Sequence, residues 1–398
     1  MTIFNILAKQ RNEGLYLLDW ISWHIAIGFN YFHITSNDCS DSSDVLLDVL
    51  SKETNLLTQY NLGKEELGSR SIGEWSFDKM NEVLEKNRDS YITCLDIDEY
   101  INFKNQDIQK IQDLELGPNS QFHLQWINFV PEDIFNFKNQ PAIIRNSSAI
   151  IKRNLNYPYS LGFSGKTIVF NQSGITLETY HDFLFNGKRL EKKKLPDVYL
   201  RHCPAGTIDE FAIRSERGQA TAQKQVASQA KKMGESVASR EIHNYKYSID
   251  LFLMYTSQGL KLKVGVNKNV VINALKIKQE LLSNPKIKTA QQQIDDYYQK
   301  KLREIKSYYI PSLVRDLKIT DIDSLSVESL EKYNSIFFKN EQEKPHDFYV
   351  LMTLANLFAG DLSKAREYCS DGLRHYASLK LLTMMRSAIL GSPYKSSP

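Results

Sequence analysis

Residues 91–99, which read YITCLDIDE, are the stretch that decides the fold. The first five are aromatic, apolar or β-branched, as expected of a short buried strand. The acidic motif Asp96-Ile97-Asp98 follows at once, so two carboxylates leave the end of this strand together. An Asp-x-Asp tripeptide alone arises often by chance. The strand before it makes this one a candidate site.

The chain before this motif alternates between strand-like and helix-like segments. A short apolar run predicts a strand at residues 3–8, and residues 31–35 and 56–60 are interpreted as two further strands. Apolar residues at helical spacing predict helices over residues 17–27, 45–50 and 77–84. Gly28 is a plausible C-cap of the first helix, and Asp41 can cap the second. Such alternation indicates a parallel α/β sheet.

Polar residues recur where the predicted strands end. Asn12, Asn37, Arg70 and Asp96 all fall at such positions. In parallel sheets, ligands bind beyond the carboxyl ends of the strands. The coincidence predicts a single site at this edge of the sheet.

The pattern changes beyond the motif. Residues 120–200 are irregular, with β-like runs at 142–144 and 167–171 that we expect to finish the sheet. Thr207 and Glu210 form a T-x-x-E capping box that opens a helix.

We expect three parts: an α/β domain over residues 1–218, a helical extension and linker over 219–319, and a helical region over 320–398. Within the linker, polar residues 219–240 are either a solvated helix or a mobile loop. The last part has the spacing of a tetratricopeptide-like helix pair, which an ordinary helical hairpin explains equally well.

Composition narrows the class of protein. The 398 residues carry 50 basic and 47 acidic side chains, a net charge of +3 that argues against a surface built to bind nucleic acid. The lysine-rich run at 188–194 reads as a solvated loop. The sequence shows neither a signal peptide nor an apolar run of membrane-spanning length, so we expect a cytoplasmic protein, with at most a peripheral membrane contact.

The acidic motif suits one kind of chemistry. Hard cations such as Mg²⁺ and Mn²⁺ prefer carboxylate oxygens, and they neutralise clustered phosphate charge. Two aspartates at a strand end can reach one metal and the ribose of a nucleotide. The motif therefore predicts a divalent metal bound with a nucleotide diphosphate.

An ordered series of motifs resembles the bacterial family 2-like glycosyltransferases and their relatives in family 92, over residues 3–218. The motifs are Lys9-Gln10-Arg11-Asn12-Glu13-Gly14, Trp20-Ile21 with His24, Gly28-Phe29, Ser36-Asn37-Asp38-Cys39-Ser40-Asp41 and Leu95-Asp96-Ile97-Asp98-Glu99-Tyr100. The resemblance implies a GT-A-like fold, a Rossmann-type mixed sheet flanked by helices. It also implies a nucleotide-sugar donor, expected to be a UDP-sugar, and a Mn²⁺ or Mg²⁺ cofactor.

The resemblance assigns roles near the amino terminus. Arg11, Asn12 and Glu13 would line the nucleotide pocket, and Asn37 stands where relatives have an aspartate that reads the uracil edge. Asp41 matches the aspartate that caps the next helix, which favours a structural role over a binding role. Arg70 could pair with phosphate oxygens or be a solvated arginine.

Two later blocks are also similar to the family. In Gln125-Trp126-Ile127-Asn128-Phe129, Trp126 could stack on the acceptor sugar or be a core residue, and Ile127 replaces an expected arginine. In the block beginning Leu200-Arg201-His202-Cys203, the resemblance implies that His202 is a metal ligand beside Asp96 and Asp98, and a purely structural histidine is the alternative. Arg214 and Arg217 on the following helix would face the diphosphate.

The expected reaction is inverting hexosyl transfer to a glycan or lipid-linked glycan acceptor, in surface polysaccharide synthesis. Glu132 and Asp133 are candidates for the carboxylate that takes the acceptor proton, and a surface turn explains them otherwise. The C-terminal helices could select the acceptor, dimerise, or make a peripheral contact with a membrane or a protein assembly. The rival hypotheses are a non-catalytic binding or scaffold protein that acts through these helices, and another metal-dependent nucleotide enzyme.

Overall fold

The computed structural model describes most of the α/β region and part of the helical region. The described residues are 2–62, 71–105, 107–114, 116–118, 120–131, 140–151, 165–203, 206–207, 210, 213, 260–316, 349, 352–353, 356 and 361–375.

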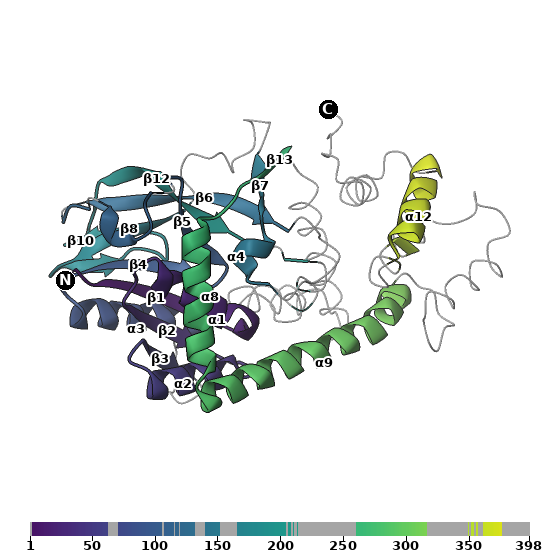
Figure 1. The fold of residues 1–398 in the computed structure, drawn as a ribbon, viewed down its shortest axis with the longest axis horizontal. Coiled ribbons are helices and arrows are strands. Elements are labelled where there is room, and N and C mark those ends of the chain that lie inside the picture. The colour runs from purple at the N-terminus through teal and green to yellow at the C-terminus, as the bar shows by residue number, and fades with distance from the viewer. Residues whose placement is uncertain are drawn as a thin grey trace.

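Strands and helices alternate through the first hundred residues, as predicted (Figure 1). They are β1 (Phe4–Gln10), α1 (Gly14–Ala26), β2 (Tyr31–Ser36), α2 (Ser43–Glu53), β3 (Leu57–Asn61), α3 (Ile72–Lys86), β4 (Ser90–Asp96) and β5 (Glu99–Phe103). A short 3-10 helix, η2 (Ile111–Asp113), precedes β6 (Gln121–Val130), α4 (Ala142–Arg145), β7 (Ser148–Ile151), β8 (Gly165–Asn171), β9 (Ile175–Leu177), β10 (Phe183–Phe185), β11 (Lys188–Arg189) and β12 (Lys192–His202). β13 (Leu260–Lys263), α8 (Lys268–Leu282), α9 (Pro285–Asp316) and α12 (Leu362–His375) complete the described elements.

The main sheet is mixed and has ten strands among the described residues. Its order is β13-β7-β6-β8-β4-β1-β2-β3, and β12 joins it by pairing with β5 and β6. Strands β3, β2, β1 and β4 are parallel, whereas β8 runs antiparallel to both β4 and β6. Strands β11, β10 and β9 form a second, small sheet. The predicted α/β class, a Rossmann-type mixed sheet with flanking helices and a helical C-terminal region, is confirmed.

Alternation along β1 divides the core between the two faces of the sheet. Phe4, Ile6 and Ala8 pack with α1, α2 and α8 on one face, while Leu7 packs with α3 and the small sheet on the other. Successive side chains of a strand point to opposite faces, so a strand covered on both reads as a continuous apolar run. This is why residues 3–8 carry such a clear strand signal.

One predicted strand is wrong. Residues 142–144 were expected to be extended, but they form the short helix α4. Pro141 directly precedes it, and its carbonyl accepts the backbone N–H groups of Ile144 and Arg145. A three-residue apolar run cannot distinguish strand from helix, and proline is well suited to a helix start.

Gly28 ends α1 as predicted. Its φ of +102° lies in the region that glycine adopts without strain, and its N–H donates to the Ile25 carbonyl. The strand that follows can therefore return directly into the sheet.

Segments far apart in sequence complete the α/β region. β13 pairs antiparallel with β7, and α8 packs along α1. The segment expected as a helical extension thus also supplies a strand to the sheet, and the three-part division remains a prediction. Among the described residues, no helix is both long and apolar enough to cross a membrane. Residues 219–240 lie outside the described residues.

Helix α9 begins beside the end of α2, where Lys286 bonds Glu53 at 2.6 Å, and then passes over the turns that follow β1 and β2. The Tyr298 hydroxyl lies 2.9 Å from the Asn12 carbonyl and 3.1 Å from Asp41 Oδ2. Ile294 packs so closely on Gly14 that a Cβ there would lie 2.9 Å from it. From these contacts the helix extends away from the sheet (Figure 1).

Replacing Tyr298 with Phe tests how firmly α9 is held. We expect the free energy of unfolding to fall by about 1–2 kcal/mol, because the buried Asp41 carboxylate loses a donor. Tyr297→Phe is the matched control, since its hydroxyl bonds only the exposed Ser40 hydroxyl at 3.0 Å among the hydrogen bonds described for it. Equal effects of the two variants in chemical denaturation would contradict this role for Tyr298.

His24 is a core residue, as predicted. It is fully buried and its Nδ1 donates to the Trp20 carbonyl at 2.8 Å. Burial lowers the pKa of His24 from 6.5 to about 3, although the bond to Trp20 raises it. The folded state therefore favours the neutral ring. The stability that this provides is complete above pH 6.5 and is lost as the pH falls towards 3.

His24→Phe should flatten the acid side of the stability profile. Between pH 7.5 and 5.5 the wild-type protein is expected to lose about 1.4 kcal/mol through this histidine alone, and the variant should lose that much less. Urea unfolding at the two pH values measures the difference. An unchanged difference in the variant would show that His24 titrates normally.

Candidate functional site

The carboxyl ends of three strands meet at one edge of the sheet. Lys9 of β1 is in register with Thr35 of β2 and with Asp96 of β4. The turns after these strands are therefore neighbours, as predicted from the polar residues at their ends.

The first turn is tied to the second. Asn12 has a left-handed backbone with φ of 52°, and its side chain bonds Ser40 through both the amide nitrogen and oxygen. Glu13 is the N-cap residue of α1 and is buried. Arg11 is half-buried beside them. These three residues lie where a nucleotide pocket was predicted, and their binding role remains a prediction.

Asp41 has the structural role that was expected of it. Its carboxylate accepts the backbone N–H of Ser43 at 3.0 Å at the start of α2 and that of Gly14 at 2.9 Å at the start of α1. Both helices thus begin on one buried carboxylate, which suits their N-terminal dipoles.

Asn37 is buried at the end of β2, where the base-reading residue was predicted. Within the described part of the chain, its side-chain Nδ2 is a buried donor with no hydrogen-bond partner. Buried donors are usually satisfied, so this atom marks a place where a ligand or another group completes the structure.

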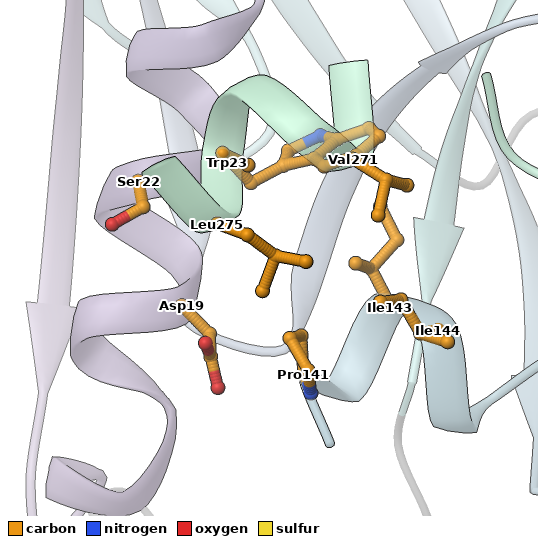
Figure 2. Close-up of a pocket in the computed structure, with 9 residues that line it drawn as sticks. Asp19, Ser22, Trp23, Pro141, Ile143, Ile144, Val271 and Leu275 are labelled. Atoms are coloured by element: carbon orange, nitrogen blue, oxygen red, sulfur yellow. The ribbon is translucent and has the colours of Figure 1, made fainter. Parts of the chain in front are cut away.

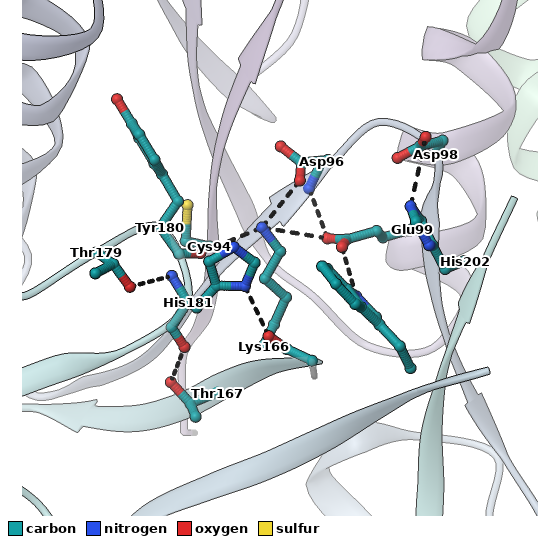
Figure 3. Close-up of polar contacts among 12 residues, drawn as sticks. Cys94, Asp96, Asp98, Glu99, Lys166, Thr167, Thr179, Tyr180, His181 and His202 are labelled. Atoms are coloured by element: carbon teal, nitrogen blue, oxygen red, sulfur yellow. Dashed lines mark hydrogen bonds and ion pairs between the residues drawn. The ribbon is translucent and has the colours of Figure 1, made fainter. Parts of the chain in front are cut away.

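The acidic motif forms the tight turn between β4 and β5. The Asp98 carbonyl accepts the N–H of Cys203 at 2.8 Å, which fixes this turn against the end of β12. His202, the last residue of β12, lies with Nε2 3.8 Å from Asp98 Oδ2 (Figure 3). Its other ring nitrogen lies 2.9 Å from Asn128 Oδ1, which orients the imidazole. Asp98 and His202 therefore lie close together although they are 104 positions apart in the sequence.

A buried lysine that sequence reasoning missed lies beside the motif. Lys166 of β8 is fully buried, and its Nζ lies 2.9 Å from Asp96 Oδ2 and 3.7 Å from Glu99 Oε2. It also donates to the Tyr180 carbonyl at 3.2 Å. A lysine inside an otherwise strand-like GKTIVFN segment is itself a signal, because buried charges need partners.

Glu99 connects this lysine to Trp126. One carboxylate oxygen accepts the Asp96 backbone N–H at 2.8 Å, and the other accepts the Trp126 indole N–H at 2.6 Å. The indole stacks on the His202 ring, with centroids 4.8 Å apart and planes 15° apart. Trp126 is half-buried, so it is neither an enclosed core residue nor a free surface ring. Its predicted contact with an acceptor sugar remains a prediction.

Charge around the motif is divided unequally. Burial raises the pKa of Asp96, but Lys166 and then Lys9 outweigh it and bring the pKa down to about 2. Burial lowers the pKa of Lys166, but the Glu99 and Asp96 carboxylates raise it above its usual value. Burial, more than any other cause, raises the pKa of Glu99 well above its usual range. Asp96 is thus a firmly ionised carboxylate.

Several predicted site residues lie outside the described residues. They are Arg70, Glu132, Asp133, Arg214 and Arg217. Among the residues that are described, no group of three or more His, Cys, Asp and Glu side chains is arranged to hold a metal ion.

Arg201, which precedes His202, has a structural role. Its guanidinium donates to the carbonyls of Ile143 at 2.7 Å and Val264 at 2.8 Å, and lies over the Phe129 ring. It holds the end of β12 against α4 and the segment after β13.

A separate, small pocket lies between α1, α4 and α8 (Figure 2). Trp23, Ile144 and Leu275 are among its lining residues, and Asp19 lies at its edge, bonded to Lys278 at 2.7 Å. None of the predicted site residues lines it.

Comparisons with known proteins add little to this picture. The sequence matches no known protein family and no curated protein. Among solved structures it is similar to an apo structure of the bifunctional glycosyltransferase WbbM, with a TM-score of 0.23 and 14% identity. The match covers 43% of this chain and 31% of that chain, so less than two thirds of the WbbM chain is represented. At this TM-score the similarity carries no argument about function.

Proposed function

We propose that this chain is a metal-dependent glycosyltransferase that transfers a sugar from a nucleotide sugar, of UDP type, to a hydroxyl of a glycan or lipid-linked glycan. The observation that carries the proposal is the meeting of Asp98 and His202, 3.8 Å apart, at the edge of the sheet where three parallel strands end. Ligands of α/β proteins bind at this edge.

The side chains of Asp98 and His202 fit a divalent cation. A carboxylate and an imidazole are common ligands of Mn²⁺, and the Asn128 contact leaves His202 Nε2 directed at Asp98. A bound Mn²⁺ or Mg²⁺ would supply charge neutralisation for the departing nucleotide diphosphate.

The donor nucleotide is assigned to the turns after β1 and β2. Asn37 offers a buried donor with no partner in the described part of the chain, which suits a carbonyl of the base. Arg11, Asn12 and Glu13 would line the pocket, and Arg70, Arg214 and Arg217 are the proposed phosphate partners.

In the proposed reaction, an acceptor hydroxyl oxygen forms a bond to the anomeric carbon while the bond from that carbon to the diphosphate oxygen breaks. The hydroxyl proton passes to a carboxylate, for which Glu132 and Asp133 are candidates, and the electron pair leaves with the nucleotide diphosphate. Trp126 would offer the acceptor its half-buried ring. We place this activity in surface polysaccharide synthesis on the cytoplasmic side of a membrane.

Calorimetric titration of UDP into the full chain, with and without MnCl₂, tests the proposal. We expect binding that depends on Mn²⁺, and metal-dependent hydrolysis of at least one member of a panel of nucleotide sugars. ADP in place of UDP tests the choice of base. Absence of nucleotide binding under all conditions would favour the rival hypothesis, a non-catalytic scaffold that acts through its helical region.

A further inference from the structure

Lys166 has no role in the reaction as proposed, yet it is the cation closest to the acidic motif among the contacts described for it. It reaches the motif from β8, a strand that pairs antiparallel with β4. Its ammonium group bonds Asp96 at 2.9 Å and lies 3.7 Å from Glu99, and the side chain is fully shielded from water (Figure 3). A buried ammonium group is costly unless carboxylates compensate it, so its position is specified by this motif.

The two aspartates of the motif consequently have different surroundings. Asp96 is engaged by a permanent cation of the protein, whereas Asp98 is directed at a histidine nitrogen that can bind a metal. The two carboxylates were expected to share one metal. Their contacts instead assign Asp96 to an ion pair with Lys166 and place Asp98 beside His202.

We propose that Lys166 is a positioning residue that acts as a built-in counter-cation for Asp96 and so restricts the protein's metal ligands to Asp98 and His202. The inference rests on the proposed function, because it concerns the metal of that same site. It revises the prediction that Asp96 is a metal ligand and keeps that prediction for Asp98 and His202.

Glu99 links the motif to the metal-facing histidine through bonds that do not involve the lysine. It accepts the Asp96 N–H and the Trp126 indole N–H, and the indole stacks on His202. Asn128 Oδ1 also contacts the histidine ring, at 2.9 Å. The orientation of His202 should therefore persist in Lys166→Met, and that variant tests the charge of the lysine.

A double-mutant cycle on the full chain tests the proposal, with Mn²⁺ affinity measured by calorimetry in the absence of nucleotide. Lys166→Met removes the counter-cation and releases Asp96, so we expect Mn²⁺ to bind about tenfold more tightly or better. Asp96→Asn should leave the affinity within about threefold of wild type, because Asp96 is not a ligand while Lys166 is present. The double variant should resemble Asp96→Asn.

Thermal unfolding with and without Mn²⁺ gives a second readout. The rise in Tm on adding Mn²⁺ should be larger in Lys166→Met than in wild type, even if the variant is less stable without metal. Lys192→Met is the matched control, because it breaks another lysine–aspartate pair, with Asp182 at 2.6 Å, among residues outside the site. It should leave both readouts unchanged.

Two results would overturn the inference. One is a loss of Mn²⁺ affinity of about tenfold or more in Asp96→Asn, which would make Asp96 a ligand in the wild-type protein. The other is an unchanged or weaker affinity in folded Lys166→Met. Should that variant not fold, the isosteric Asp96→Asn decides alone.

The nucleotide titration separates this inference from the proposed function. Suppose that wild type binds UDP with Mn²⁺ and that Asp96→Asn loses the metal. The proposed function would then stand, and the role of Lys166 would be overturned. If only Lys166→Met binds Mn²⁺, the role of Lys166 as a counter-cation is supported. The proposed reaction would then have to proceed without a metal in the wild-type protein. Absence of Mn²⁺ binding in every variant would overturn both.

Discussion

Asp98→Ala is expected to lower sugar transfer by about 10³-fold or more, because a preorganised group that stabilises leaving-group charge commonly contributes 10²–10³-fold and here the metal depends on it. The fold should persist, since the turn is held by the Asp98 backbone carbonyl, which accepts the Cys203 N–H at 2.8 Å and does not depend on the side chain. Product formation from the donor identified in the panel measures the loss.

Asp107→Ala is the control for this prediction. Asp107 is exposed, and it lies on the segment after β5, outside the site. It should transfer sugar as wild type does. Full activity of Asp98→Ala, retained in EDTA, would refute a metal held by this aspartate.

Glu210→Ala is expected to have the largest effect on stability, a loss of about 3–5 kcal/mol in the free energy of unfolding, because it removes a carboxylate that is ion-paired with a buried arginine. Glu210 forms an ion pair with Arg145, and both side chains are almost completely buried, at 2% and 5% exposure. Tyr16 also donates to the Glu210 carboxylate, at 3.1 Å. The predicted capping box is present as well: Thr207 N–H donates to Glu210 at 2.7 Å, and the Glu210 N–H donates to the Thr207 hydroxyl at 3.4 Å.

Glu210→Gln separates charge from hydrogen bonding. It keeps an acceptor for Thr207 and Tyr16 but removes the negative charge, so it should lose most of the same stability. Chemical denaturation of the two variants and wild type measures the difference. A loss below about 1 kcal/mol in Glu210→Ala, as expected of exposed ion pairs, would show that Arg145 finds another partner.

The first hundred residues could be predicted well because short strands alternate there with helices whose apolar residues recur at helical spacing. Strands 3–8, 31–35, 56–60 and 91–95 all lie within two residues of the strands in the structure. Prediction was weaker after residue 120. Strands β6, β8 and β12 pair with partners distant in sequence, and their polar residues are placed by those partners.

The residues of the candidate site also differ in how well they could be predicted from the sequence. The Asp96-Ile97-Asp98 turn could be located because a local strand signal precedes it, and His202 because of the block around it. Lys166 could not be assigned to the site from the sequence, because its approach to Asp96 depends on the antiparallel register of β4 with β8. In that register Thr93 pairs with Ile168, which is 75 positions away in the sequence. Only tertiary pairing brings such a residue to the site.

The docking of helix α9 is coupled to the order of the turns after β1 and β2, where the nucleotide is proposed to bind. Tyr298 contacts Asn12 and Asp41 together, so neither turn can rearrange without changing the contacts of the helix. By thermodynamic reciprocity, a ligand that favours the ordered turns must favour docked α9 by the same free energy, and a partner that displaces α9 must weaken that ligand by the same factor. Hydrogen exchange in the part of α9 around Tyr298 would then report ligand binding at a distance from the ligand itself.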